Sequence, residues 1–141
     1  MALFSPYGNY RENQVTTASR GQLLLMTYDG MLRFLEEGRR AIAESRYDAQ
    51  SLNINRAQSL LLELLLSLDH SVMPELTRNL DRLYRYMYDR LTTANVRDDE
   101  GALTEVAGML ANLREAWAEA ERTTRGQAGA EQGEHRGGYT A

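Results

Sequence analysis

The sequence predicts an all-α protein: an antiparallel up-and-down four-helix bundle with an extended N-terminal arm and a disordered C-terminal tail. Two segments place apolar residues at alternating intervals of three and four, which puts their side chains on one face of an α-helix. These two sets are Leu24, Tyr28, Met31, Leu35, Gly38 and Ile42, and Leu103, Val106, Leu110, Leu113, Trp117 and Ala120. A leucine-rich segment lies between them, and short connections favour antiparallel neighbours.

The N-terminal arm is expected over residues 1–18, which mix Ser, Pro, Gly, Asn and Tyr without periodicity. Ser19 and Gln22 then form an S-x-x-Q capping box, so a first helix is expected over about 20–46. Gly38 lies on the apolar stripe of this helix, where the close approach of another helix explains a residue of low helix propensity.

The second helix is expected over about 49–70, and it is apolar on more than one side. Its predicted core face comprises Ile54, Ala57, Leu61, Leu64, Leu65 and Leu68. At 100° per residue, Leu60, Leu62 and Leu66 lie outside this face, at about −100°, 100° and 140° from its centre. Either the helix packs against three neighbours, or the arm covers it, or a partner segment binds in an apolar groove.

The third helix is expected over about 74–95, because Pro74 suits the first turn of a helix. Its core stripe comprises Leu76, Leu80, Leu83, Tyr84, Met87, Leu91 and Ala94. Tyr86 projects away from that stripe and Tyr88 lies at its edge, so both are candidate interface residues. The arginines of this helix alternate with Asp81 and Asp89, which predicts an ion-paired surface.

The fourth helix is expected to begin after the carboxylates of residues 98–100, which the helix dipole favours at that end, and to end near Thr124. The bundle therefore covers residues 19–124. Residues 125–141 contain five of the 11 glycines and almost no large apolar residue. Such a segment buries too little surface to offset its ordering entropy, so a flexible tail is expected.

Several kinds of chemistry are excluded by the residues that the chain lacks. It has no cysteine and no lysine, and neither of its 2 histidines follows a glutamate by three residues, so thiolate, P-loop and di-iron sites are not expected. The net charge of −4 disfavours a general nucleic-acid binder. No apolar run approaches the ~20 residues of a membrane span. We expect no enzymatic activity, no metal, no cofactor, no secretory signal and a cytoplasmic location.

An ordered set of motifs over residues 7–122 resembles the FliS family of flagellin export chaperones. The N-terminal part is Tyr10-Arg-Glu-Asn13-Gln-Val15-Thr-Thr-Ala-Ser19, followed by an apolar run and Tyr28-Asp29-Gly30. Further along, Asn79-Leu-Asp81-x-Leu83-Tyr84-x-Tyr86-Met87 and Leu113-Arg114-x-x-Trp117 resemble the third and last helices of the family. Arg20 stands where the family usually has proline, which costs a few tenths to ~1 kcal/mol without threatening the fold.

The resemblance implies a cytoplasmic, non-enzymatic chaperone of flagellar assembly. Such a protein binds the disordered C-terminal segment of flagellin, prevents premature polymerisation, and assists delivery to the flagellar type III export machinery. In that family the flagellin client wraps around the bundle, partly as helices in apolar grooves, which is a use for the surplus apolar surface of this chain.

We expect Leu60, Leu62, Leu66, Tyr86 and Tyr88 to line part of the client groove. The arm, with Tyr7, Tyr10, Asn13 and Val15, is expected to lie against the bundle and to occupy or border the groove when no client is bound. The alternative is a bundle that dimerises through the same surface, or a scaffold for a different partner. A homodimer of the client-free protein is compatible with both interpretations.

Overall fold

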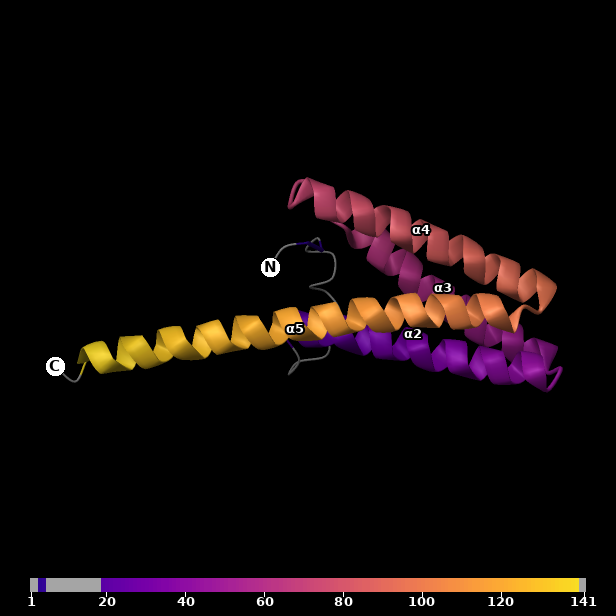
Figure 1. Ribbon diagram of the computed structural model, residues 1–141, viewed down its shortest axis with the longest axis horizontal. Coiled ribbons are helices and arrows are strands. Elements are labelled where there is room, and N and C mark those ends of the chain that lie inside the picture. Colours follow the sequence, from indigo (N-terminus) through magenta and orange to yellow (C-terminus); the bar gives the residue numbers. More distant parts are fainter. Residues whose placement is uncertain (1–2, 5–18, 140–141) are drawn as a thin grey trace.

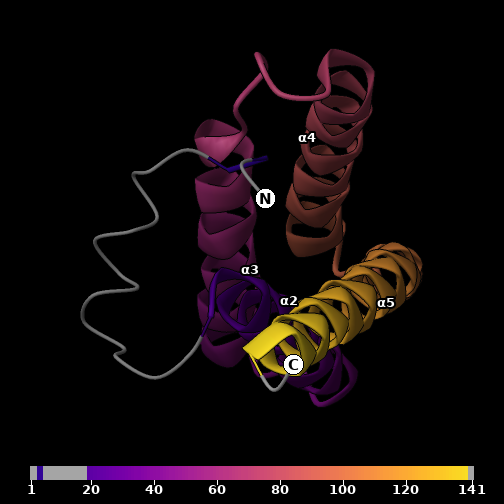
Figure 2. The same cartoon turned by 90° about the vertical axis from the view of Figure 1, so that its left-hand side faces the viewer.

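The computed structural model describes residues 3–4 and 19–139, with side chains described up to residue 126. Within this part of the chain it contains four helices, α2 (Arg20–Ala43), α3 (Tyr47–Ser67), α4 (Pro74–Arg97) and α5 (Glu100–Tyr139), shown in Figure 1. Each helix packs against the next one along the chain, and α5 returns to α2. Viewed toward one end, the four helices form the corners of a bundle (Figure 2). The predicted all-α antiparallel bundle is confirmed.

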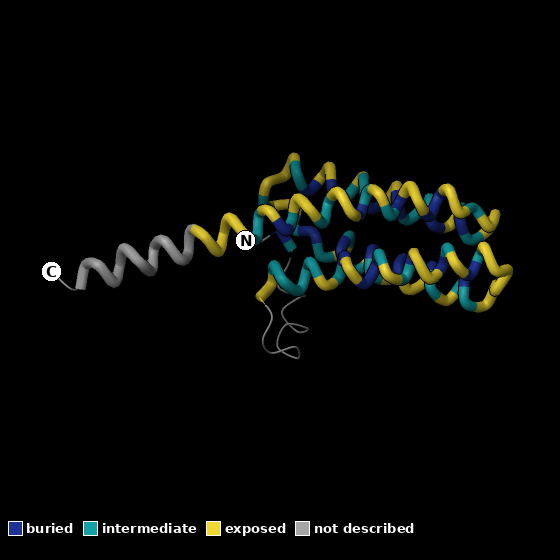
Figure 3. The backbone as a smooth tube through the Cα atoms, turned by 60° about the horizontal axis from the view of Figure 1, so that its bottom comes forward, coloured by how far each residue is buried: buried dark blue, intermediate teal, exposed yellow. Residues whose placement is uncertain are grey.

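The predicted apolar stripes form the core of this bundle. In α2, Tyr28, Met31 and Leu35 are buried, and the stripe of α5 is buried at its first three positions. The buried residues of all four helices face one another across the interior, while the outward faces are exposed (Figure 3). The 3-4 spacing therefore located the core of both helices correctly, because spacing along a helix fixes which side chains share a face.

Gly38 marks a close helix approach, as predicted, and side chains of both α3 and α5 meet it there. A Cβ atom at this position would lie 3.3 Å from Cγ1 of Ile54 in α3 and 3.7 Å from Cδ1 of Leu103 in α5. A methyl group fits only if the Ile54 side chain shifts slightly, and a larger side chain would extend further into this contact. A buried glycine is used here for its small size.

The substitution Gly38→Val is expected to destabilise the bundle by about 1–3 kcal/mol, because overpacking displaces neighbouring core side chains. The matched control is Gly108→Ala in α5, where an added Cβ meets nothing within 4 Å. That control is expected to stabilise the protein by about 0.5–1 kcal/mol through helix propensity. Urea denaturation of both variants measures the difference, and equal free energies of unfolding would contradict the close approach.

Three helix ends differ from those predicted, each for a local reason. α2 ends at Ala43 rather than near residue 46, because Ser45 adopts a left-handed backbone with φ 56°. α3 ends at Ser67 rather than near residue 70, because Leu68 is extended and forms an antiparallel bridge with Phe4. α4 continues to Arg97, where the left-handed Asp98 ends it.

The end of α5 is the largest correction. The backbone remains helical to Tyr139, whereas the sequence predicted an end near Thr124, and Figure 1 shows α5 continuing past the other three helices. Ion pairs one turn apart support the helix where it leaves the bundle, with Arg125 Nε 3.0 Å from Glu121 Oε1. The predicted flexibility of residues 125–141 concerns motion and stays a prediction.

A pair of buried hydroxyl groups crosses the core. The hydroxyl oxygens of Tyr28 in α2 and Tyr84 in α4 lie 2.7 Å apart, and both residues are fully buried. Since α2 and α4 occupy opposite corners of the bundle, this hydrogen bond joins helices that share few other contacts. Burial raises the pKa of both hydroxyls, so both remain protonated well above neutral pH.

Candidate functional site

The surplus apolar surface predicted on α3 is present at Leu62 and Leu66. Their side chains are 39% and 75% exposed, respectively. Because they lie one turn apart, they share one face of the helix. Two exposed leucines on one face of a helix form an apolar surface on which a partner can dock.

Leu60 lies on another edge of α3. It is partly buried and packs against the core, and its Cδ1 atom is 3.5 Å from the Cβ position of Gly30 in α2. Leu60 therefore covers the contact between α2 and α3. Of the three alternatives given for the leucines outside the core face, packing against a neighbouring helix is the one that explains Leu60.

Hydrogen bonds from Gln58 identify the edge of α3 that faces α4. The Gln58 Nε2 atom donates to the carbonyl oxygen of Tyr88 at 3.1 Å and to Oγ1 of Thr92 at 2.9 Å. Leu62 follows Gln58 by one helical turn, so it lies along this same edge, toward the outside. We call Leu62, Leu66 and Tyr88 the α3–α4 edge.

Tyr86 points to the opposite side of α4. It is exposed, and its hydroxyl donates to Oε2 of Glu105 in α5, while Oε1 of the same carboxylate accepts from Arg90 Nε at 2.9 Å. This hydrogen bond raises the pKa of the Tyr86 hydroxyl. The structure thus distributes the five predicted groove residues over three edges of the bundle, with Leu62, Leu66 and Tyr88 on one of them.

An apolar hollow of about 360 Å³ lies at the start of α4, lined by Met73, Pro74, Glu75 and Leu76. Met73 is exposed and has a left-handed backbone, with φ 45°. The buried Thr77 hydroxyl lies within hydrogen-bond distance of the carbonyl oxygens of Met73 and Pro74, and so fixes this turn. The sequence predicted Pro74 in the first turn of this helix and Leu76 on its core stripe, but it did not reveal the hollow.

A second hollow, of about 210 Å³, lies between α2 and α5. It is lined by Leu32, Leu35, Glu36, Arg39, Leu103, Thr104 and Ala107. Its floor is apolar and its rim is charged. The sequence did not reveal it, because two helices far apart in the chain form its walls.

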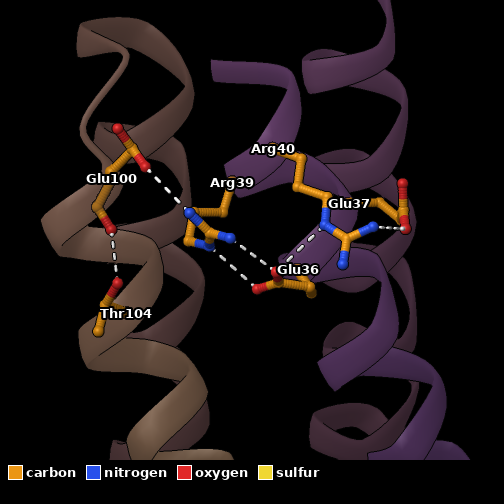
Figure 4. Close-up of polar contacts among 6 residues, drawn as sticks. All are labelled: Glu36, Glu37, Arg39, Arg40, Glu100 and Thr104. Atoms are coloured by element: carbon orange, nitrogen blue, oxygen red, sulfur yellow. Dashed lines mark hydrogen bonds and ion pairs between the residues drawn. The ribbon is translucent and has the colours of Figure 1, made fainter. Parts of the chain in front are cut away.

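The charged rim of this hollow is a network of ion pairs, shown in Figure 4. Arg39 Nη2 donates to Glu36 Oε1 at 2.7 Å, and Arg39 Nη1 lies 3.4 Å from Glu100 Oε1 at the start of α5. The hydrogen bond from Arg39 holds the pKa of Glu36 well below its usual range, at about 2. Glu36 therefore stays ionised at neutral pH, and the Arg39–Glu100 pair links α2 to α5.

The predicted ion pairing within α4 is confirmed at Arg85, whereas Arg90 pairs with a carboxylate of α5 that was not predicted. Arg85 Nε lies 2.6 Å from Asp81 Oδ1, and Arg90 Nε lies 2.9 Å from Glu105 Oε1. Within the described residues, no cluster of three or more acidic or histidine side chains could hold a metal ion. None of the helices in that same part of the chain is long and apolar enough to cross a membrane.

The described start of the N-terminal arm lies on the bundle. Leu3 is buried, and its carbonyl oxygen accepts a hydrogen bond of 2.7 Å from the backbone N–H of Asp69. The Phe4 ring packs edge-on against Trp117, with ring centroids 6.4 Å apart. Four other arm residues named above, Tyr7, Tyr10, Asn13 and Val15, lie outside the described residues.

The similarity of this chain to known proteins extends over the bundle and the described start of the arm. The family described as "Flagellar protein FliS" matches residues 3–124, which include the four helices up to the point where α5 leaves the bundle. The flagellar secretion chaperone FliS of Bacillus subtilis is 37% identical over 125 residues, 89% of this chain and 92% of that protein. FliS of Escherichia coli is 35% identical over 77% of this chain and 80% of its own length. FliSB of Pseudomonas aeruginosa is 33% identical over 75% and 84%, respectively.

Proposed function

Because the chain belongs to the FliS family of flagellar secretion chaperones, we propose that it binds the disordered C-terminal segment of flagellin, prevents premature polymerisation and assists type III export. Membership of a chaperone family also agrees with the predicted absence of enzymatic activity. The observation that supports client binding most directly is the exposed apolar surface of the α3–α4 edge.

The α3–α4 edge suits an amphipathic helix of the client. Leu62 and Leu66 present apolar side chains one turn apart, and the carbonyl oxygen of the partly buried Tyr88 in α4 accepts a hydrogen bond from Gln58, one turn before Leu62. Helices bind in such places by placing residues three and four apart against an apolar face. Each leucine that becomes fully buried contributes about 1.5–3 kcal/mol, which helps to offset the cost of ordering a disordered client.

The hollow between α2 and α5 is a second contact for the same client. It lies on a different side of the bundle from the α3–α4 edge, and its apolar floor is bordered by the Arg39 ion pairs. A long disordered segment can wrap around a bundle and reach both places, which one short helix cannot do. Leu60 and Tyr86 contribute along the edges between these two surfaces.

The N-terminal arm borders the client surface in this proposal. Leu3 and Phe4 already pack at the end of α3, close to the turn that leads to Met73. Tyr10, Asn13 and Val15 belong to the segment that joins this contact to the start of α2, and we assign them to the border of the site. The chaperone acts in the cytoplasm, where flagellin is made, and hands its client to the export machinery.

The test is binding of a purified C-terminal flagellin peptide, measured by calorimetry and by sedimentation at low protein concentration. We expect a one-to-one complex and a negative heat-capacity change, because apolar surface is buried. A scrambled peptide of the same composition is the control. Equal binding of both peptides, or a dimer that the peptide leaves unchanged, would favour the alternative of a dimerisation or scaffold module with another partner.

A further inference from the structure

The first turn of α2 lacks the negative charge that usually stabilises a helix N-terminus. Ser19 caps the helix through its hydroxyl, which accepts from the Gln22 N–H at 3.1 Å, but the first turn contains no acidic residue. Arg20 places a cation at this end, which the positive pole of the helix dipole disfavours. A carboxylate from another part of the chain would improve the electrostatics there.

Glu121 of α5 supplies that carboxylate. Its Oε1 atom accepts a hydrogen bond of 3.3 Å from the Ser19 hydroxyl, and the side chain is only 18% exposed. Its Oε2 atom lies 1.8 Å from the point where a Cβ atom of residue 21 would be. The carboxylate can occupy this place because residue 21 is glycine, so Gly21 and Glu121 depend on each other.

The same face of α5 holds the start of the N-terminal arm. Trp117 lies one turn before Glu121 and contacts the Phe4 ring. Phe4 also bridges to Leu68 at the end of α3. Two successive turns of α5 therefore hold the chain at both described ends of the arm. Phe4 packs against Trp117, and Ser19 forms a hydrogen bond with Glu121.

We propose that Glu121 is a positioning residue for the docking of Leu3 and Phe4. By capping α2 across the helix interface, Glu121 fixes the last turn of α5 that packs in the bundle. That turn orients the Trp117 ring against which Phe4 packs. Residues 122–126, which follow Glu121, are exposed, so their contacts do not hold α5 against the bundle.

The experiment uses the fluorescence of Trp117, which is the 1 tryptophan of the chain. Acrylamide quenching of the full-length protein reports how well Phe4 covers the indole, and the Phe4→Ala variant defines the undocked value. We expect Glu121→Gln to raise the quenching constant toward that value, and Glu121→Gln combined with Phe4→Ala to raise it no further. Gly21→Ala is expected to act like Glu121→Gln, because the added methyl group displaces the carboxylate, although it improves helix propensity.

The matched control is Glu119→Gln, since Glu119 lies on the outer face of α5 and pairs only with Arg122 among the described residues. This control is expected to leave quenching at the wild-type value. If Glu121→Gln and Gly21→Ala lower the melting temperature but leave quenching unchanged, Glu121 has a purely structural role and the proposal is wrong. The measurement needs no flagellin, so its failure would not affect the proposed function.

Discussion

Replacing Leu66 by glutamate is expected to weaken binding of the flagellin C-terminal peptide by about ten- to a hundredfold. The side chain is 75% exposed in the free protein, so folding loses little when it becomes polar. In the complex, a buried leucine contributes about 1.5–3 kcal/mol, and a tenfold change in affinity corresponds to about 1.4 kcal/mol. Leu62→Glu is expected to have the same direction of effect. Calorimetric titration measures both, with circular dichroism to verify helicity.

Leu52→Glu is the matched control for these two variants. Leu52 is on the same helix and is 50% exposed, but it precedes Leu62 and Leu66 by 10 and 14 residues, about 15 Å and 21 Å along the helix axis. Its replacement is expected to leave peptide affinity within about twofold. Equal loss in all three variants would indicate a nonspecific charge effect, and no loss at Leu62 and Leu66 would remove them from the site.

The second large effect is expected at the buried hydroxyl pair. Replacing either Tyr28 or Tyr84 by phenylalanine leaves the other hydroxyl without its partner in an apolar core, which costs about 1–3 kcal/mol. Removing both hydroxyls leaves neither member of this pair unpaired, so the double variant is expected to be no less stable than either single variant. A double-mutant cycle of urea unfolding measures the coupling, and strictly additive losses would contradict the interaction.

The same pair predicts how stability changes at alkaline pH. Burial raises the pKa of both hydroxyls above the usual value of 10.0, so the folded chain keeps protons that the unfolded chain releases. Their contribution is therefore complete below about pH 10 and decreases as the pH rises above that value. The free energy of unfolding of the wild type is expected to fall more steeply in this range than that of the double phenylalanine variant.

The sequence predicted the core well because the relevant signal is local. Tyr28, Met31 and Leu35 are buried where the 3-4 spacing placed them, and the angular positions of Leu62 and Leu66 predicted their exposure. Which side chains share a face depends on helix geometry alone. Whether a residue outside the core face is exposed also depends on the neighbouring helices, because Leu60 packs at the contact with α2 while Leu62 is exposed.

Contacts between distant residues were not predictable in the same way. The end of α3 is set by the pairing of Leu68 with Phe4, and Gly21 is explained by Glu121, roughly 100 positions later in the chain. Likewise, helical angles showed that Tyr86 leaves its own stripe, but they could not show which neighbour it faces. Tyr86 faces α5, because its hydroxyl forms a hydrogen bond with Glu105.

The position of Leu3 and Phe4 affects how the protein should be handled in binding experiments. An affinity tag or fluorescent protein fused to the N-terminus would begin two residues before a buried leucine, at the end of the bundle where α3 turns toward α4. It would crowd the surface on which the client is expected to bind. Fused to the other terminus, beyond Tyr139, the same tag would lie at the end of a helix that extends about 27 Å past Glu121. Pull-down studies should therefore place the tag there.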